Sequence, residues 1–138
     1  MKRDLDVIRE ILLYMEKSDF GEVDRNKMSE EIGRESKVVN YQLKLLYQAR
    51  YISGPVIRGK ASHHSEKWEY YQDLIASVKP HEITWDGHEY LETIRDPEIW
   101  KETKACAESI GSFGIETIKS IATGFVKTKL KQHTGIEI

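Results

Sequence analysis

The chain has 138 residues, of which 39% are apolar and 32% charged, and its net charge is −2. This composition fits one domain with a helical extension and excludes an intrinsically disordered chain. Its apolar runs are too short to span a bilayer, and its start (MKRDLDVIRE) lacks the apolar core of a signal peptide. Cys106 is its single cysteine, so an internal disulfide is excluded. We therefore expect a cytoplasmic protein.

The first predicted element is a helix from a cap at Asp4 to about Lys17. Apolar side chains recur there at spacings of three and four, as they do on the buried face of a helix. These residues are Leu5, Ile8, Leu12 and Met15, with Ile11 beside them. Residues 18–24 are expected to form a turn.

Residues 24–49 predict a short helix, a tight turn and a longer helix. Met28 and Ile32 fit the short helix, and Gly33 suits a left-handed helix end. Ser36 is the expected cap of the second helix. Its buried stripe is expected to contain Val39, Leu43, Leu46 and Ala49. This order is the spacing of a helix-turn-helix, in which the second helix lies in the DNA major groove, although an ordinary helical hairpin gives similar periodicity.

The segment YISGPVIRG is β-branched and aromatic, which predicts an edge strand kinked at Gly54-Pro55. Residues 59–67 are expected to form a loop. Strand-like patches follow between Trp68 and Thr84, with a helical turn around residues 66–75 as the alternative. We interpret the whole as a β-hairpin with an elongated loop. A helix-turn-helix followed by a hairpin is a winged helix.

Three helices are predicted after the hairpin. Thr84 caps the first, whose apolar positions are Trp85, Tyr90, Leu91 and Ile94. Asp96-Pro97 starts the next, because proline favours the first helical position. Its expected inner face contains Ile99, Trp100, Thr103, Ala107 and Ile110, and Gly111-Ser112 ends it. A last helix from Phe113 to about Lys131 presents Ile118, Ile121, Ala122 and Phe125.

The predicted fold class is therefore α+β and mainly helical: a winged helix-turn-helix with a C-terminal two-helix extension. The winged-helix domain is expected over residues 1–96, and the extension over residues 97–138. Residues expected to matter for structure rather than chemistry are Trp85, Gly87, Asp96, Pro97 and Trp100. Trp85 and Trp100 are interpreted as core anchors.

The segment VNYQLKLLYQARYI resembles the recognition helix and following strand of winged-helix bacterial regulators, with Arg50 where those families place glycine. Nearly the whole chain resembles an uncharacterised family of small phage and prophage proteins. This second resemblance is carried by KRDLDVIREILLYME, the YQLKLL segment, ITWDGHEYLETIRDPEIWKETK with its TWDGHEYL block, and the final amphipathic helix. The resemblance implies a mobile-element setting, a winged-helix-like body and no catalytic residue.

The charge distribution favours a nucleic-acid partner for the middle of the chain. Residues 34–67 carry a net charge of +5, whereas residues 68–118 carry −7. Lysine suits phosphates and guanine, asparagine pairs with adenine, and tyrosine contacts a phosphate or a thymine methyl. The candidate DNA-binding residues are Arg34, Ser36, Lys37, Asn40, Tyr41, Lys44, Arg58 and Lys60. The alternative is a solvated helix face, and the pI of 6.2 is low for a DNA reader.

Catalytic and metal sites are not expected. The five histidines (His63, His64, His81, His88 and His133) form no zinc-binding spacing. Glu89, Glu92 and Asp96 recur at three and four residues on one expected helix face, where solvated carboxylates do no acid–base chemistry. No phosphate-binding glycine loop is present. We therefore expect no enzyme and no cofactor.

Two functions remain open. The first is a transcriptional regulator of phage or prophage origin that binds double-stranded DNA as a homodimer, formed through its first and last helices. The second is a protein-interaction factor on the same scaffold, such as an inhibitor of a host or defence protein, favoured by the acidic 68–118 segment.

Overall fold

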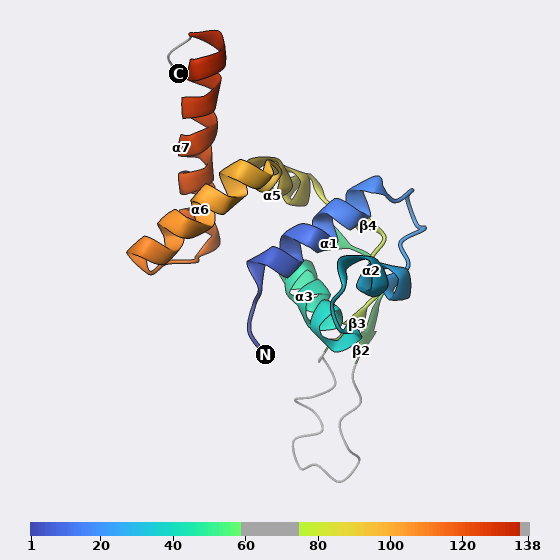
Figure 1. Cartoon of the computed structure of the whole chain (residues 1–138). Coiled ribbons are helices and arrows are strands. Elements are labelled where there is room, and N and C mark those ends of the chain that lie inside the picture. Colours follow the sequence, from blue (N-terminus) through green and yellow to red (C-terminus); the bar gives the residue numbers. More distant parts are fainter. Residues whose placement is uncertain (59–74, 136–138) are drawn as a thin grey trace. The chain divides into compact units, whose positions relative to one another are not determined.

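The computed structural model describes residues 1–58 and 75–135 (Figure 1). The described chain is α+β and mainly helical, which confirms this part of the predicted fold class. It divides into two compact units, Met1–His88 and Glu89–Ile138, and the division falls inside a helix, whereas the sequence predicts a boundary after residue 96. The candidate DNA-binding residue Lys60 and the histidines His63 and His64 lie outside the described residues, as does most of the helical turn proposed around residues 66–75.

Three helices open the first unit: α1 (Leu5–Lys17), α2 (Arg25–Ile32) and α3 (Ser36–Gln48). Asp4 caps α1, because its carboxylate accepts from the backbone N–H groups of Asp6 and Val7. Asp24 caps α2 in the same way. Gly33 ends α2 in the left-handed conformation, with φ 69°, which a residue without Cβ adopts at no steric cost. Arg34 and Glu35 then connect Gly33 to the start of α3.

The ends of α3 differ from the sequence prediction in two ways. Ser36 is the first helical residue, and the cap position belongs to Glu35, whose side chain makes no capping hydrogen bond. Ala49 is exposed, because it is the C-cap residue just past the last turn rather than part of the buried stripe. Arg50 follows in the left-handed region with φ 62°, a backbone conformation that glycine adopts more readily.

The strands form a narrow antiparallel ribbon in two parts. β1 (Ile52–Ser53) pairs with β4 (Glu82–Ile83), with Ile52 opposite Ile83. β2 (Val56–Arg58) pairs with β3 (Ile75–Val78), with an irregularity between Ile57 and Arg58. The expected kink at Gly54-Pro55 separates the two parts. A Cβ on Gly54 would lie 2.0 Å from the backbone oxygen of Lys79, so only glycine fits at this position between β1 and β2.

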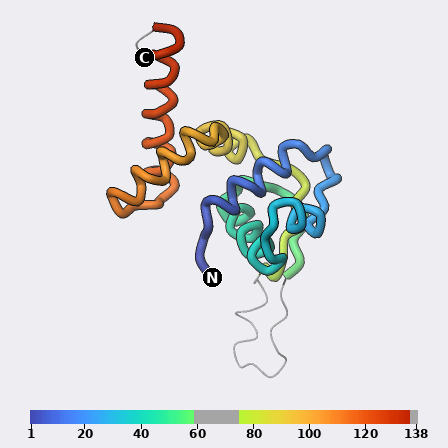
Figure 2. Tube along the Cα trace, in the orientation of Figure 1, coloured from blue at the N-terminus to red at the C-terminus, as the bar shows by residue number. Residues whose placement is uncertain are grey.

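The core of the first unit lies between α1, α2, α3 and the ribbon. α1 packs on α2, α3 and β4, and α3 packs on α2, β1 and β3. Figure 2 follows the described chain through these elements, from blue at α1 to yellow-green at β4. Fully or almost fully buried apolar side chains come from every one of these helices and from three strands: Val7, Ile8, Ile11, Leu12, Met15, Met28, Val39, Leu43, Leu46, Ile52, Val78 and Ile83. Three of the four residues predicted for the α3 stripe are among them.

Three further helices follow: α5 (Trp85–Ile94), α6 (Pro97–Ile110) and α7 (Ile115–Thr134). Asp96 caps α6 with Pro97 at its first turn, and Gly111 ends it with φ 74°. Within the second unit α6 packs on α7. Among the described residues no helix combines the length and apolarity needed to cross a membrane.

Burial along these helices departs from the prediction at several positions. Ile110 is 60% exposed, because it lies in the last turn of α6 just before the chain turns away. α7 begins at Ile115 rather than Phe113 and continues through Thr134, so residues 131–134 are helical rather than frayed. Only Ile118 and Ala122 of α7 are buried, and both lie in its first half. The second half of α7 is therefore held by few contacts of its own side chains.

Candidate nucleic-acid interface

The outward side of α3 carries the polar residues that the sequence singles out. Ser36 and Lys37 are exposed, and Asn40, Tyr41 and Lys44 are half-buried. Their spacings of three and four place them together, opposite the buried side chains of Val39, Leu43 and Leu46. We call Ser36, Lys37, Asn40, Tyr41 and Lys44 the polar face of α3. Two lysines, an amide and a phenol on one helix face are groups that bind phosphates and base edges.

The start of α3 adds backbone donors to this face. Glu35 makes no side-chain capping hydrogen bond, so among the first N–H groups of α3 only those of Val38 and Val39 have an acceptor within the described residues, the backbone oxygen of Glu35. Backbone N–H groups at a helix N-terminus attract anions. The backbone before α3 is itself fixed, since the N–H of Arg34 donates to the oxygen of Ser29 at 3.1 Å. The turn therefore presents the beginning of α3 in one orientation.

Two of the candidate cations already have a carboxylate nearby. Arg34 Nε lies 3.5 Å from Glu10, and Lys37 Nζ lies 3.6 Å from Glu35. Both cations are well exposed, and pairs of this kind contribute about 0–1 kcal/mol. Among the residues that the structure describes, Lys44 has no carboxylate within ion-pair distance. A phosphate would therefore compete with weak contacts only.

Of the two candidate cations in the predicted hairpin, Arg58 and Lys60, only Arg58 is among the described residues. Arg58 is exposed on β2, opposite Ile75 of β3, and β3 packs on α3. Lys60, the second predicted wing cation, lies outside the described residues. The structure thus brings Arg34, Ser36, Lys37, Asn40, Tyr41 and Lys44 together on one turn and helix, and places Arg58 on the neighbouring ribbon.

Gln42 is a residue of this region that sequence reasoning missed. It is 1% exposed and lies on the buried side of α3. Its side-chain amide donates to the backbone oxygen of Lys2, and its oxygen accepts from the backbone N–H of Asp4, each at 2.9 Å. The only sequence signal was a polar residue inside an apolar stripe, between Val39, Leu43 and Leu46. The partners are 38 and 40 residues away, so no local pattern identifies them.

The structural residues around α5 divide into two groups. Trp85 is 80% exposed, so its prediction as a core anchor is wrong. It lies five, six and nine residues before Tyr90, Leu91 and Ile94, which places it on the other side of the helix from these fully buried residues. Gly87 and Trp100 are buried. A Cβ on Gly87 would lie 2.0 Å from the backbone oxygen of Tyr51, so α5 touches the chain before β1 backbone to backbone.

Asp96 joins the two helices of the second unit. Besides capping α6, its carboxylate accepts a hydrogen bond from Lys129 of α7 at 2.6 Å. The hydrogen bond from Lys129, reinforced by the backbone N–H groups of Ile99 and Glu98, lowers the pKa of Asp96 below its ordinary value of 3.8. The same hydrogen bond raises the pKa of Lys129. The two groups thus hold each other in their charged forms.

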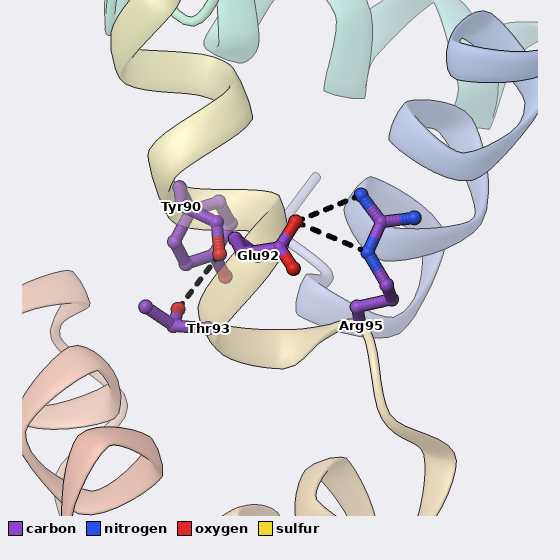
Figure 3. A network of polar contacts seen from close by, with 4 residues as sticks. All are labelled: Tyr90, Glu92, Thr93 and Arg95. Atoms are coloured by element: carbon purple, nitrogen blue, oxygen red, sulfur yellow. Dashed lines mark hydrogen bonds and ion pairs between the residues drawn. The ribbon is translucent and has the colours of Figure 1, made fainter. Parts of the chain in front are cut away.

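The carboxylates of the predicted α5 face do not act as one group. Figure 3 shows Glu92 occupied by Arg95, whose Nε and NH2 groups lie 3.2 and 3.1 Å from one carboxylate oxygen, while Thr93 donates to the backbone oxygen of Tyr90. Asp96 lies beyond the end of α5 and belongs to α6. Within residues 1–58 and 75–135, no three His, Cys, Asp or Glu side chains gather as a metal would require.

A family model described as "Hypothetical protein (DUF2513)" matches residues 2–113. The chain belongs to this family. An uncharacterized protein of Haemophilus influenzae (strain Rd) is 31% identical over 132 residues, which cover 94% of this chain and 99% of that protein. No solved structure matches the chain.

The DUF2513 match contains the polar face of α3, Gln42 and the Asp96 cap, and it ends before α7 begins at Ile115. The relative from Haemophilus, in contrast, matches over almost the whole chain. The DUF2513 part of the molecule is therefore the first unit together with α5 and α6.

Proposed function

We propose that residues 1–88 form a winged helix that binds double-stranded DNA, and that the protein is a transcriptional regulator acting in the cytoplasm of a bacterium. The proposal rests on one observation: α3 follows a short helix and a left-handed glycine and presents Lys37, Asn40, Tyr41 and Lys44 on its outward side. The order of α1, α2, α3 and the antiparallel ribbon supports it, because that is the element order of a winged helix.

The test is the binding of mixed-sequence duplex DNA across a salt series. The combined change Lys37→Ala and Lys44→Ala should flatten the slope of log K against log salt by about 1.8, at about 0.9 per phosphate contact. Lys101 and Lys127 are exposed lysines of α6 and α7, and their combined change to alanine is the matched control. Absence of binding at low salt refutes the proposal, and an equal effect of the control pair refutes the placement on α3.

We also propose that the protein is a homodimer, since helix-turn-helix proteins commonly bind two symmetric DNA half-sites as dimers. The proposal is supported in the second unit by partly exposed apolar side chains on and between α6 and α7: Ile110, Phe113, Val126 and Leu130. Light scattering after gel filtration should give twice the chain mass. Val126→Glu with Leu130→Glu should then yield monomers, and a monomeric parent protein would overturn this part.

A phage or prophage origin is part of the proposal and rests on the TWDGHEYL block and the resemblance it carries. The second candidate function is a factor that binds a host or defence protein. It is favoured by Trp85, which is 80% exposed at the start of α5, because tryptophan is enriched at interaction hot spots. In a pulldown from nuclease-treated host lysate with this chain as bait, Trp85→Ala should then abolish capture of the partner protein. The combined change Lys37→Ala and Lys44→Ala should retain that capture. Loss of that protein with the lysine changes alone would exclude this candidate.

A further inference from the structure

Thr84 joins the end of α3 to the start of α5. Its hydroxyl donates to the backbone oxygen of Arg50 at 2.6 Å, and its backbone N–H donates to the oxygen of Tyr51 at 3.0 Å. The same hydroxyl accepts from the N–H of Gly87 at 3.1 Å and so caps α5. All of these residues belong to the first unit. The backbones of Arg50 and Trp85, far apart in the sequence, are therefore held beside each other.

Both residues held there depart from what the stability of the fold alone favours. Arg50 is the one residue other than glycine with a positive φ in the described part of the chain, and φ 62° strains a residue with a Cβ. Trp85 is 80% exposed. Strained backbone conformations are concentrated at functional sites. An exposed tryptophan alone is unremarkable, but here it adjoins the strained residue. We call Arg50 and Trp85 the exposed pair.

The Arg50 guanidinium is available to a partner. Arg50 is exposed, and no carboxylate of the described residues lies within ion-pair distance of it. A guanidinium binds a carboxylate through two parallel hydrogen bonds. The indole of Trp85 adds a large apolar surface and one N–H donor. Arginine and tryptophan are among the residue types that contribute most to binding at protein–protein interfaces, so the exposed pair suits a protein partner.

Charge and position favour a protein over a nucleic acid at the exposed pair. Glu82 and Asp86 are exposed on either side of Trp85 in the sequence, and their carboxylates would repel a phosphate chain. Arg50 also lies beyond the last turn of α3, about 20 Å from the start of that helix at about 1.5 Å per residue. Helix-turn-helix proteins contact bases with the first residues of this helix.

We propose that Arg50 and Trp85 form a hot spot that binds a protein segment carrying an apolar side chain with a carboxylate near it. The indole covers the apolar side chain, the guanidinium binds the carboxylate, and Thr84 is the positioning residue that holds both. Because the backbone is already fixed, binding requires little further ordering. The inference rests on the second candidate function, to which it adds a contact residue and the chemistry of the partner.

The test uses a library of random linear peptides selected on the immobilised full chain, followed by titration of the enriched peptides in solution. These peptides should combine an apolar residue with Asp or Glu, and amide replacement of that acid should weaken binding. Trp85→Ala and Arg50→Asn should each weaken binding by about 30-fold, the effect expected of a hot-spot residue. Asparagine adopts the left-handed conformation readily, so Arg50→Asn removes the charge and keeps the backbone.

The matched controls alter an exposed aromatic residue and an exposed cation elsewhere on the first unit. They are Phe20→Ala, at a side chain 74% exposed, and Lys27→Ala on α2. Both should leave the peptide affinity unchanged. Arg50→Lys should lie between the parent protein and Arg50→Asn, because an ammonium keeps the charge and loses the paired hydrogen bonds.

Thr84→Val tests the positioning role, since it removes the hydroxyl and leaves both side chains of the exposed pair in place. It should weaken peptide binding, and Thr84→Ser, which keeps the hydroxyl, should restore it. Arg50→Gly should weaken binding while raising the urea midpoint, whereas a merely structural Arg50 would leave binding unchanged. If Thr84→Val does not fold, the variants of Arg50 and Trp85 decide.

The outcomes separate this inference from the function on which it rests. Enrichment of no peptide, or peptides whose affinity survives both Trp85→Ala and Arg50→Asn, overturns the hot spot. If Trp85→Ala abolishes capture of the partner protein and Arg50→Asn does not, the second candidate function stands and the exposed pair fails. Retained capture with Trp85→Ala refutes both. Enriched peptides that are basic, or a preference for single-stranded oligothymidine over any peptide, overturn the partner chemistry.

Discussion

Gly87→Ala should destabilise the first unit, against the usual effect of this substitution in a helix. Alanine in a helix interior is normally favoured over glycine by about 1 kcal/mol. At residue 87, however, the new Cβ would lie 2.0 Å from the oxygen of Tyr51, 2.6 Å from Cγ2 of Ile83 and 2.9 Å from the carbonyl carbon of Tyr51. Two of these three atoms belong to the backbone, so rotating a side chain does not relieve the clash.

Forcing an extra methyl group into a packed site costs about 1–3 kcal/mol, and here the backbone of α5 or of Tyr51 must move as well. We expect a net loss near the upper end of that range, about 2 kcal/mol after the gain in helix propensity. For a unit of 88 residues this corresponds to a fall in Tm of roughly 10 °C. Urea denaturation followed by circular dichroism, with the midpoint as the readout, measures the same loss.

Gly124→Ala is the matched control, because Gly124 lies on α7 with nothing within 4 Å of an added Cβ. There the same substitution should stabilise by up to about 1 kcal/mol. The reasoning fails if Gly87→Ala is as stable as the parent protein, or if both glycine substitutions shift the midpoint in the same direction.

Three further predictions follow from burial, charge and backbone shape. Trp100→Ala should cost about 3–5 kcal/mol because Trp100 is 4% exposed, whereas Trp85→Ala, at 80% exposure, should stay within about 0.5 kcal/mol; comparable losses in urea midpoints would contradict the burial. The pKa of Asp96 is lowered in the folded state, so its contribution to the free energy of unfolding is present above pH 3.8 and is lost as the pH falls through the folded pKa. The difference in Tm between the parent protein and Asp96→Asn should therefore vanish in acid and persist near neutrality, where Lys129 is charged. Arg50→Gly should raise the free energy of unfolding by up to about 1 kcal/mol, since φ 62° strains any residue with a Cβ, and a lower urea midpoint would refute the strain.

The parts of the fold that could be predicted from the sequence are those set by near neighbours. Asp4, Asp24, Gly33 and Asp96 act within a few residues of themselves, and the structure places a helix end at each of them. The polar face of α3 could be predicted for the same reason, because helical periodicity alone separates it from the buried stripe.

Other features could not be predicted from near neighbours. Some depend on contacts with residues far along the chain, and one depends on the side of a helix on which a residue lies. Gln42 and Gly87 each meet a backbone more than thirty residues away, so no local pattern could reveal them. The prediction that Trp85 is buried is wrong because it rests on the size of the side chain and not on its helical position. Trp85 lies two and a half turns before Ile94 and therefore on the opposite side of α5. The predicted cap of α3, Ser36, lies one residue too late, because serine is a better capping residue than glutamate but Glu35 holds the cap position here.

Because the helices bury different shares of their residues, they should differ in how often they unfold locally. In α1, six of thirteen residues are buried, whereas α7 buries two of twenty, neither beyond Ala122. Amide hydrogens of α1 should therefore exchange with solvent only when the whole first unit unfolds, and those after Ala122 through brief local openings. The hydrogen bond from Lys129 to Asp96 is one anchor that such an opening breaks. Of the two helices α1 and α7, the half of α7 after Ala122, which lies beyond the DUF2513 match, is thus the segment that protease and deuterium should reach first.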